Sequence, residues 1–350
     1  MPGTARGRRR SVLGSSVAII VLLFGVVSLL GDASYEGLRS LLPVEEPSTL
    51  GLSGIVGVGE LVAWGLRPVS GLVVEIVGGY WAAVILGYAL IPVGVAAALS
   101  SGGGLGLAAG YWVERLGKAV RGPARDSLLS AAAPGSKRGL VFGVHEALDQ
   151  LGAIIGLVIA YTIVSHNAPW VLLAVPGALT VPVLLVAKRL YPAEALERMG
   201  KGVRVAARSV RASLPAALMV LGLGSLTPNP LAVSHVASLA GVEAGILPLL
   251  YAAAMASDAL SAIPLGALYD RSPALSVGVL AGSGLGAAAA LLAGHPALAA
   301  LLSGVAEAGY ETVARAMARG ATGYGLLGLS RGVSAAASIL VYSLAYRALA

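Results

Sequence analysis

Long apolar stretches recur along the whole chain, and short breaks rich in Pro, Gly, Asn and Ser separate them. A helix of about 20 apolar residues is long enough to cross the hydrocarbon core of a bilayer. The first apolar run follows Arg6 to Arg10 and is longer than the core of a signal peptide, so we interpret it as a membrane span. The pattern predicts eleven membrane-spanning helices, at 13–42, 50–77, 80–100, 104–123, 139–165, 168–189, 213–240, 242–269, 273–293, 296–318 and 323–349.

The composition favours a membrane protein over a soluble one. Of the 350 residues, 57% are hydrophobic and only 12% are charged, whereas an average soluble domain has about 25% charged residues. The 48 glycines would let helix backbones approach closely inside a membrane bundle. Cysteine is absent, which excludes disulfides and thiolate metal sites, and we expect neither a cofactor nor a metal.

The placement of Lys and Arg predicts the orientation of the chain. With the N-terminus inside, the breaks on the outer side contain no Lys or Arg. The inner side holds Arg6 to Arg10, Lys137, Arg138, Arg271, Arg319 and the basic stretch 188–211. The positive-inside rule therefore predicts a multi-pass protein of the cell membrane with a cytoplasmic N-terminus. These charges are ordinary anchors to the lipid bilayer, so nucleic acid is not expected as a partner.

The central basic stretch also suggests an internal duplication. We predict an N-terminal six-helix half at 1–187, a cytoplasmic basic linker at 188–212 and a C-terminal five-helix half at 213–350. The sequence from Gly266 to Arg271, which closes the eighth span, echoes the sequence from Gly71 to Glu75, which closes the second. Two parallel halves joined by a cytoplasmic loop are the layout expected of an alternating-access transporter.

At these residues the chain resembles the major facilitator superfamily. The hallmark loop between the second and third helices of each half reads Gly-x-Leu-x-Asp-Arg-x-Gly-Arg-Arg in that superfamily. The second half of this chain keeps Gly266, Leu268, Asp270 and Arg271. The first half keeps Gly71 and Gly78 and has Glu75 in place of the Asp. The resemblance implies that these six residues of the two copies, Gly71, Glu75, Gly78, Gly266, Asp270 and Arg271, form a gating-loop motif.

A prokaryotic branch of that superfamily, mostly of unassigned substrate, is similar over nearly the whole chain. The similarity is clearest from 24 to 160, where the stretches 28–36, 115–126 and 138–153 carry it. Glu146 and Tyr111 depart from it, since we expect Arg at both positions. The resemblance implies an all-α membrane bundle of two pseudo-symmetric halves. The superfamily usually has twelve helices, so the twelfth is missing here, either because this member is short or because the chain is truncated.

Charged residues at membrane depth are costly and are therefore candidates for function. In the first span Asp32, Glu36 and Arg39 fall on one helical face, and in the second span Glu60 and Arg67 share a face. Glu36 and Arg39 could simply neutralise each other. A carboxyl that carries protons must be able to gain and lose one near neutral pH, and Asp32 or Glu60 is the candidate for this role.

The fourth and fifth spans carry a second polar group. Glu114 and Arg115 lie deep, and a gate at the cytoplasmic mouth is implied by the resemblance for Lys118, Arg121, Arg125 and Asp126, with Glu75 and Asp149 as partners. His145-Glu146-Ala-Leu-Asp149 resembles a zinc motif only superficially, since the second His is absent. We expect His145 and Asp149 to form a hydrogen-bonded pair instead.

In the second half the intramembrane polar set is Asp258, Glu307, Glu311, Arg315 and Arg331. Glu307, Glu311 and Arg315 are spaced four apart and can pair along one helix face. Pro228-Asn229-Pro230 interrupts the seventh span and frees backbone carbonyls there.

Together these features predict a secondary active transporter, and not an enzyme, that moves a small organic solute by alternating access. We expect protons as the coupling ion, export as the direction and a monomer as the working unit. An uptake permease of the same fold is the alternative. A membrane-embedded enzyme or a transporter-derived sensor is the alternative of another class, and the scattered His residues speak against the enzyme.

Overall fold

The computed structural model describes residues 5–45, 49–101, 103–133, 137–166, 168–193, 195, 199–243 and 246–349. Within these residues the chain is helical and contains no strand. In the first half of the chain the helices are α1 (Ala5–Glu45), α2 (Thr49–Gly65), α3 (Arg67–Val77), α4 (Tyr80–Ser101), α5 (Gly103–Ala132), α6 (Arg138–His166) and α7 (Val171–Leu190). In the second half they are α9 (Val203–Leu226), α10 (Pro230–Leu239), α11 (Leu247–Arg271), α12 (Pro273–Leu292), α13 (Pro296–Gly309), η1 (Tyr310–Ala314), α14 (Arg315–Met317) and α15 (Gly320–Leu349).

Each of the eleven predicted spans is helical over most or all of its described residues, but three of them are divided. The second span breaks at Leu66, next to Pro68 in the first turn of α3. The seventh breaks before α10, where the Asn229 side chain accepts a hydrogen bond from the backbone N–H of Ala232 at 2.8 Å and caps the new helix. The tenth passes through the π-helical turn η1. Among the described residues, eight helical segments are individually long and apolar enough to cross a membrane.

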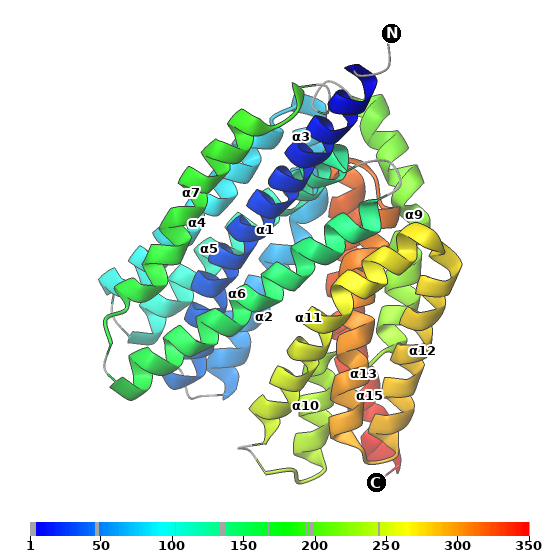
Figure 1. The fold of residues 1–350 in the computed structure, drawn as a ribbon. Coiled ribbons are helices and arrows are strands. Elements are labelled where there is room, and N and C mark those ends of the chain that lie inside the picture. The colour runs from blue at the N-terminus through cyan, green and yellow to red at the C-terminus, as the bar shows by residue number, and fades with distance from the viewer. Residues whose placement is uncertain are drawn as a thin grey trace.

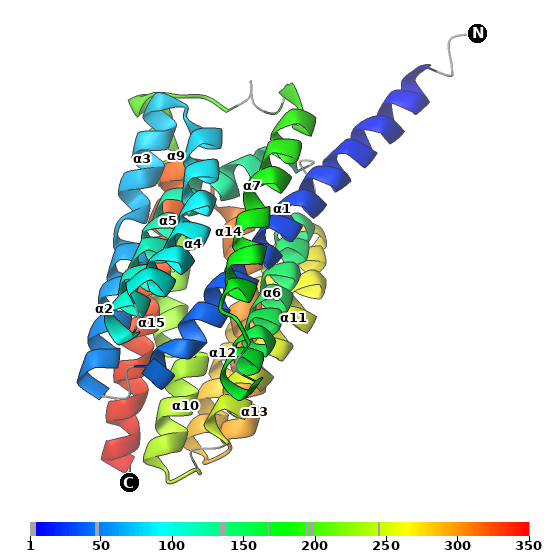
Figure 2. The same cartoon turned by 90° about the vertical axis from the view of Figure 1, so that its left-hand side faces the viewer.

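The helices form two groups, one from α1 to α7 and one from α9 to α15 (Figures 1 and 2). The most extensive packing across the groups is that of α6 on α11 and of α3 on α15. Helix α1 begins at one end of the bundle, together with the α7–α9 connection and the start of α15 (Figure 1). We call this the basic end, since Arg138, Arg271 and Arg319 also lie there. The other is the opposite end. Residues 194 and 196–198 of the basic linker lie outside the described residues.

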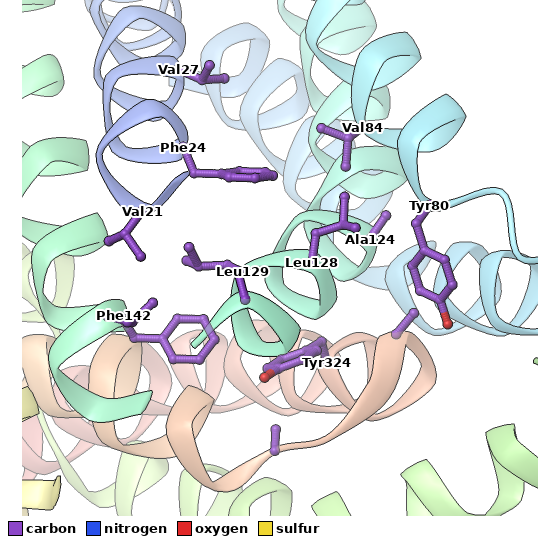
Figure 3. Close-up of a cluster of buried hydrophobic side chains, with 14 of the residues drawn as sticks. Val21, Phe24, Val27, Tyr80, Val84, Ala124, Leu128, Leu129, Phe142 and Tyr324 are labelled. Carbon is purple, nitrogen blue, oxygen red and sulfur yellow. The ribbon is translucent and has the colours of Figure 1, made fainter. Parts of the chain in front are cut away.

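A shared apolar cluster joins the groups near the basic end. Figure 3 shows Phe24 from α1, Leu128 from α5, Phe142 from α6 and Tyr324 from α15 around it. The Phe142 and Tyr324 rings lie 5.9 Å apart between centroids, and both side chains are buried. This cluster therefore holds α15 of the second group against α5 and α6 of the first.

Large apolar side chains are exposed all around the bundle. Leu105 is 86% exposed, Leu260 78% and Leu61 72%. A protein in water would not leave so many such residues uncovered, so this surface faces lipid. The structure thereby confirms an all-α membrane protein built as two packed helical groups.

Candidate functional site

A cavity of about 610 Å³ lies between the two groups of helices. A second hollow of about 350 Å³ continues it toward the opposite end, and both are lined by Glu36, Trp64, Lys118, Tyr251, Met255, Glu307 and Glu311. The second hollow also reaches Arg39 in the last part of α1, Asn229 at the N-cap of α10 and Ile339 on α15. Together the two form a continuous space that approaches the opposite end of the bundle.

Two carboxyl groups meet on the wall of the cavity. The Asp32 carboxyl of α1 lies against that of Asp149 on α6, and Asp32 is buried. The Ser28 hydroxyl, one turn before Asp32, donates to Asp149. Lys118 is close enough to interact electrostatically with both acids, although it forms no ion pair in the described part of the chain. Two adjacent carboxylates repel each other, and a proton shared between them would remove that repulsion.

Helix α5 contributes a row of cations that are held by aromatic rings and acids. Arg115 and Arg121 both pair with the buried Glu114 at 2.6 Å. Arg115 also pairs with Glu60 at 3.3 Å and lies 3.6 Å over the Tyr35 ring. The Glu60 carboxylate also accepts hydrogen bonds from the Tyr111 hydroxyl at 2.9 Å and from the Trp64 ring N–H at 2.8 Å, so both of its oxygens have partners.

A network of ion pairs around Arg315 connects the first group of helices to the second. We call this network the floor of the cavity. Arg315 contacts Asp126 at 3.8 Å and Glu146 at 3.4 Å in the first group, and it pairs with Glu311 on its own side. Gln150 extends the network by donating to Glu146 at 2.9 Å and to the buried Asp258 at 3.0 Å.

Three further ion pairs lie around the two hollows. Arg125 pairs with Asp126 at 2.9 Å, and Arg331 pairs with Glu307. Nearer the opposite end, Arg39 pairs with Glu36 at 3.5 Å. Most charges at the cavity are thus compensated by fixed neighbours.

Arg67 is different. It begins α3, lines the cavity and is only 8% exposed, yet the described residues offer it neither an ion pair nor a hydrogen-bond acceptor. Its guanidinium lies 4.0 Å from the centroid of the Trp64 ring. A guanidinium carries five N–H donors and stays charged, so this cation is unusually under-satisfied.

The basic end is closed by two carboxylates that cap helices of the other group. Glu75, buried at the end of α3, accepts from the backbone N–H of Thr322 at 3.0 Å in the first turn of α15. Asp270, at the end of α11, accepts from the backbone N–H groups of Gly139 and Leu140, both at 2.8 Å, in the first turn of α6. Each acid thus neutralises the positive end of a helix that belongs to the opposite group.

Glycines allow the helices to touch at the same interface. A Cβ on Gly139 would lie 2.2 Å from the carbonyl oxygen of Gly266, and one on Gly71 would lie 2.3 Å from that of Ala321. Gly320, the first residue of α15, has a positive φ of 65° and fits between Ser209 and Glu75. The closed end therefore depends on backbone contact as well as on the two caps.

Comparison with known proteins agrees with this geometry. No family model matches the chain. An uncharacterized protein of Mycobacterium tuberculosis is 39% identical over 288 residues, which cover 74% of this chain and 68% of that protein. An uncharacterized MFS-type transporter of Methanocaldococcus jannaschii is 31% identical over 186 residues, 49% of this chain and 46% of its own.

Solved structures show the same fold. The fucose:proton symporter of E. coli superposes with a TM-score of 0.68 at 17% identity, covering 95% of this chain and 93% of its own. A bacterial homologue of the iron transporter ferroportin has a TM-score of 0.65 at 14% identity, covering 92% and 90%. The chain has the fold of major facilitator superfamily transporters. It is a multi-pass membrane protein with that fold.

Most of the predicted residues lie around the cavity. Asp32, Glu36, Arg67, Lys118, Arg121, Arg125, Asp149, Glu307 and Glu311 line the main space, and Arg39, Glu60, Arg115 and Arg331 line its continuation. Glu114, Asp126, His145 and Asp258 are buried and do not line the main space. Gly71, Glu75, Gly266 and Asp270 lie at the closed end, whereas Gly78 ends α3 with a φ of 82° and Arg271 is exposed.

Two expected pairings are wrong. Asp149 bonds to Ser28 and not to His145, whose two ring nitrogens are buried without any hydrogen-bond partner in the described residues. Glu75 does not meet the cations of α5, because the close approach of α3 to α15 turns it toward Ser209 and Thr322. The predicted Glu36–Arg39 and Glu311–Arg315 pairs are present.

Several cavity residues were not predicted, chiefly Trp64, Gln150, Tyr88, Tyr161 and Tyr251. Rings and amides at membrane depth are common on lipid-facing and core surfaces alike, so their residue type carries little signal. The spacing of Trp64, four residues after Glu60 and three before Arg67, is the one feature that could have placed it on the same face.

Proposed function

We propose that this protein is a secondary transporter of the major facilitator superfamily that moves a small organic solute across the cell membrane by alternating access, coupled to protons. The observation that carries the proposal is the charged cavity, which continues toward one end of the bundle and is sealed from the other by the Glu75 and Asp270 caps. A cavity closed at one end only is what one state of an alternating-access cycle requires.

The positive-inside rule supports placing the basic end in the cytoplasm. In that orientation the structure corresponds to an outward-facing state, the state that is also named for a structure of the fucose:proton symporter and for the ferroportin homologue. A membrane-impermeant maleimide tests this in whole cells. A cysteine at the exposed Glu243 should be labelled and one at the exposed Arg204 should not, and the reverse pattern would invert the proposed orientation.

Proton coupling is proposed for the Asp32–Asp149 pair. Acids can be neutralised by a proton, and this pair lies on the cavity wall with the Ser28 hydroxyl and Lys118 beside it. A proton taken up here would change the charge of the wall, and that change can bias which end of the bundle is closed. Glu60 is the weaker candidate, because Arg115, Tyr111 and Trp64 hold it as an ion.

Purified protein in liposomes loaded with a pH-sensitive dye tests the coupling. Solutes drawn from organic acids, amines and sugars are added in turn, and the dye reports any proton movement that depends on the solute. We expect such movement for the parent protein, its loss in Asp32→Asn and its retention in the exposed control Glu243→Gln. Coupled movement that persists in Asp32→Asn would remove Asp32 from the mechanism.

Export of the solute in exchange for incoming protons is the direction we propose. Uptake together with protons is the alternative, and the shared fold with the fucose:proton symporter of E. coli is the observation that favours it. The sign of the dye response separates the two, since efflux driven by an inward proton gradient acidifies the compartment that the solute leaves.

A further inference from the structure

The unpartnered Arg67 carries information about the substrate. Its Nε is fully enclosed and has no hydrogen-bond partner, and no other N–H of its guanidinium has an acceptor among the described residues. Stacking on Trp64 covers one face of the guanidinium. That contact does not satisfy the N–H donors, which point outward in the plane of the group.

The surroundings of Arg67 form a shaped site. Trp64 is fixed by its hydrogen bond to Glu60, which Arg115 and Tyr111 hold in turn. A Cβ on Gly328 of α15 would lie 2.6 Å from Cδ of Arg67. The side chain thus lies between a fixed ring and a helix backbone.

A second glycine leaves the guanidinium itself uncovered. A Cβ on Gly122 of α5 would lie 3.6 Å from Cζ of Arg67, so there is no side chain at this position to shield the charge. Lys118, four residues earlier on α5, is a second cavity-lining cation without an ion pair in the described chain.

The nearest acids are already engaged by other arginines. Asp126 and Glu311 are the acids that interact most with Arg67 electrostatically. Asp126 pairs with Arg125 and Arg315, and Glu311 pairs with Arg315 and lies 3.8 Å from Arg331. Neither lies within ion-pair distance of Arg67.

Unpaired acids and an unpaired arginine have different consequences for the charge of the ligand that the cavity binds. A buried carboxyl such as Asp32 can neutralise itself by binding a proton, so the surplus of acids around the cavity does not require a cationic ligand. Arginine cannot release its proton under these conditions, and an uncompensated buried charge is costly. The ligand that best compensates Arg67 is therefore an anion, and a planar carboxylate matches the guanidinium with two parallel hydrogen bonds.

The cavity also presents an apolar wall for the remainder of such a ligand. This wall consists of Ala153, Ile154 and Leu157 on α6 and Ala252, Met255 and Ala256 on α11. A space of about 610 Å³ is within the usual range for a compact organic molecule.

We infer that the substrate is a small organic anion whose carboxylate, or an equivalent planar anionic group, pairs with Arg67 while its apolar body lies against α6 and α11. The inference rests on the proposed transport function, since it names the class of solute that the same cavity takes. It assigns Arg67 to ligand binding and leaves proton coupling to the Asp32–Asp149 pair.

Three probes with one body and different charges test the inference. They are 2-naphthoate, the neutral 2-naphthamide and the cationic 2-naphthylmethylammonium, each titrated calorimetrically into the purified full-length protein. We expect the anion to bind at least about tenfold more tightly than the amide, because hydrogen bonds between two charged groups are stronger than those to a neutral group. The cation should bind most weakly.

Variants assign the effect to Arg67. Arg67→Gln should remove the preference for the anion, and Arg67→Lys should keep the preference but weaken naphthoate binding by about tenfold, since an ammonium cannot form the two parallel bonds. Arg208→Gln, at an exposed position of α9, removes the same charge from the protein and should leave all three affinities unchanged. Arg67→Lys keeps the test decisive if Arg67→Gln fails to fold.

Equal affinities for the three probes, tighter binding of the cation, or no naphthoate binding at millimolar concentration would overturn the inference. An anion preference that persists in Arg67→Gln would overturn the role of Arg67. The assay uses no membrane and no gradient, so its failure leaves the proposed transport function standing. A protein that binds the anion through Arg67 but moves no solute in liposomes would contradict the transport proposal and not this inference.

Discussion

The closed basic end and the central cavity both place acids of one helical group against donors of the other, but they use different donors. At the basic end Glu75 and Asp270 accept from backbone N–H groups at helix starts. In the cavity Arg315 shares its guanidinium among Asp126, Glu146 and Glu311.

A backbone N–H has one position and one direction, so a cap is either made or lost as the groups move apart. An arginine with three acids can lose one and keep the others. The basic end is therefore suited to an all-or-none seal, and the floor of the cavity to a contact that persists while the groups rock against each other. The following predictions separate these two kinds of contact.

The largest effect is expected from blocking the seal. Gly139→Leu would place a Cβ 2.2 Å from the Gly266 carbonyl oxygen, an overlap with backbone that a rotamer change cannot relieve. A cysteine introduced at Ala256 in this cysteine-free chain reports access to the cavity from the opposite end. We expect its labelling from that end to slow by about 100-fold as the population shifts away from the closed basic end.

Gly282→Leu is the matched control for this substitution. Its Cβ would meet no atom within 4 Å, so labelling at Ala256 should not change. If Gly139→Leu also leaves the labelling rate unchanged, α6 and α11 separate locally while the basic end stays closed. The contact between their backbones would then not be what closes the basic end.

The ion network of the floor should contribute mainly to stability. Arg315→Gln leaves Asp126, Glu146 and Glu311 without their shared cation, and breaking a buried ion pair from one side costs about 3 kcal/mol. The thermal unfolding midpoint of purified protein measures this loss. Adding Glu146→Gln removes one of the stranded charges and should restore part of the stability.

Arg211→Gln, at an exposed position of α9, should leave the midpoint unchanged. A midpoint for Arg315→Gln that matches this control would show that the floor acids are hydrated or protonated and do not depend on Arg315.

The two caps should have intermediate and nearly equal effects. Glu75→Gln and Asp270→Asn each keep an acceptor oxygen but lose the charge that faces a helix start, an interaction worth about 1 kcal/mol or somewhat more. A cysteine at Ser130, which lines a pocket at the basic end, should be labelled about tenfold faster in each variant. The caps lie on separate helix pairs, so their effects should multiply in the double variant. A double variant no faster than either single one would mean that the two caps open together as one unit.

The fold could be predicted from the sequence because its main determinant is the length and polarity of helical segments. Even so, the π-helical turn η1 was not predicted, since nothing in the residues Tyr310–Ala314 marks the shift in backbone hydrogen bonding there. The cavity residues could be named because charges at membrane depth are rare, so Asp32 and Arg67 stood out.

Partners were harder to predict than positions. The expected His145–Asp149 pair relied on spacing within one helix, but α1 brings Ser28 closer to Asp149. The gating-loop motif predicted the positions of Glu75 and Asp270. Which helix each carboxylate caps depends on the helix of the other group whose first turn lies next to it. That is a property of the packing of α3 on α15 and of α11 on α6, which no local pattern specifies.

The smallest effect is expected from Tyr324, where the seal has a redundant contact. Arg138 donates to the Tyr324 hydroxyl at 2.8 Å and also to the Ala318 carbonyl at 2.7 Å, so removing the hydroxyl leaves one acceptor in place. Tyr324→Phe keeps the ring beside Phe142 and should weaken the seal by about 0.5–1 kcal/mol, seen as labelling at Ser130 that is only two- to fivefold faster. Combined with Asp270→Asn, it should add its small factor and no more. A tenfold or larger increase from Tyr324→Phe alone would rank this hydroxyl with the two carboxylate caps, and the seal would then rest on Arg138 as much as on the helix starts.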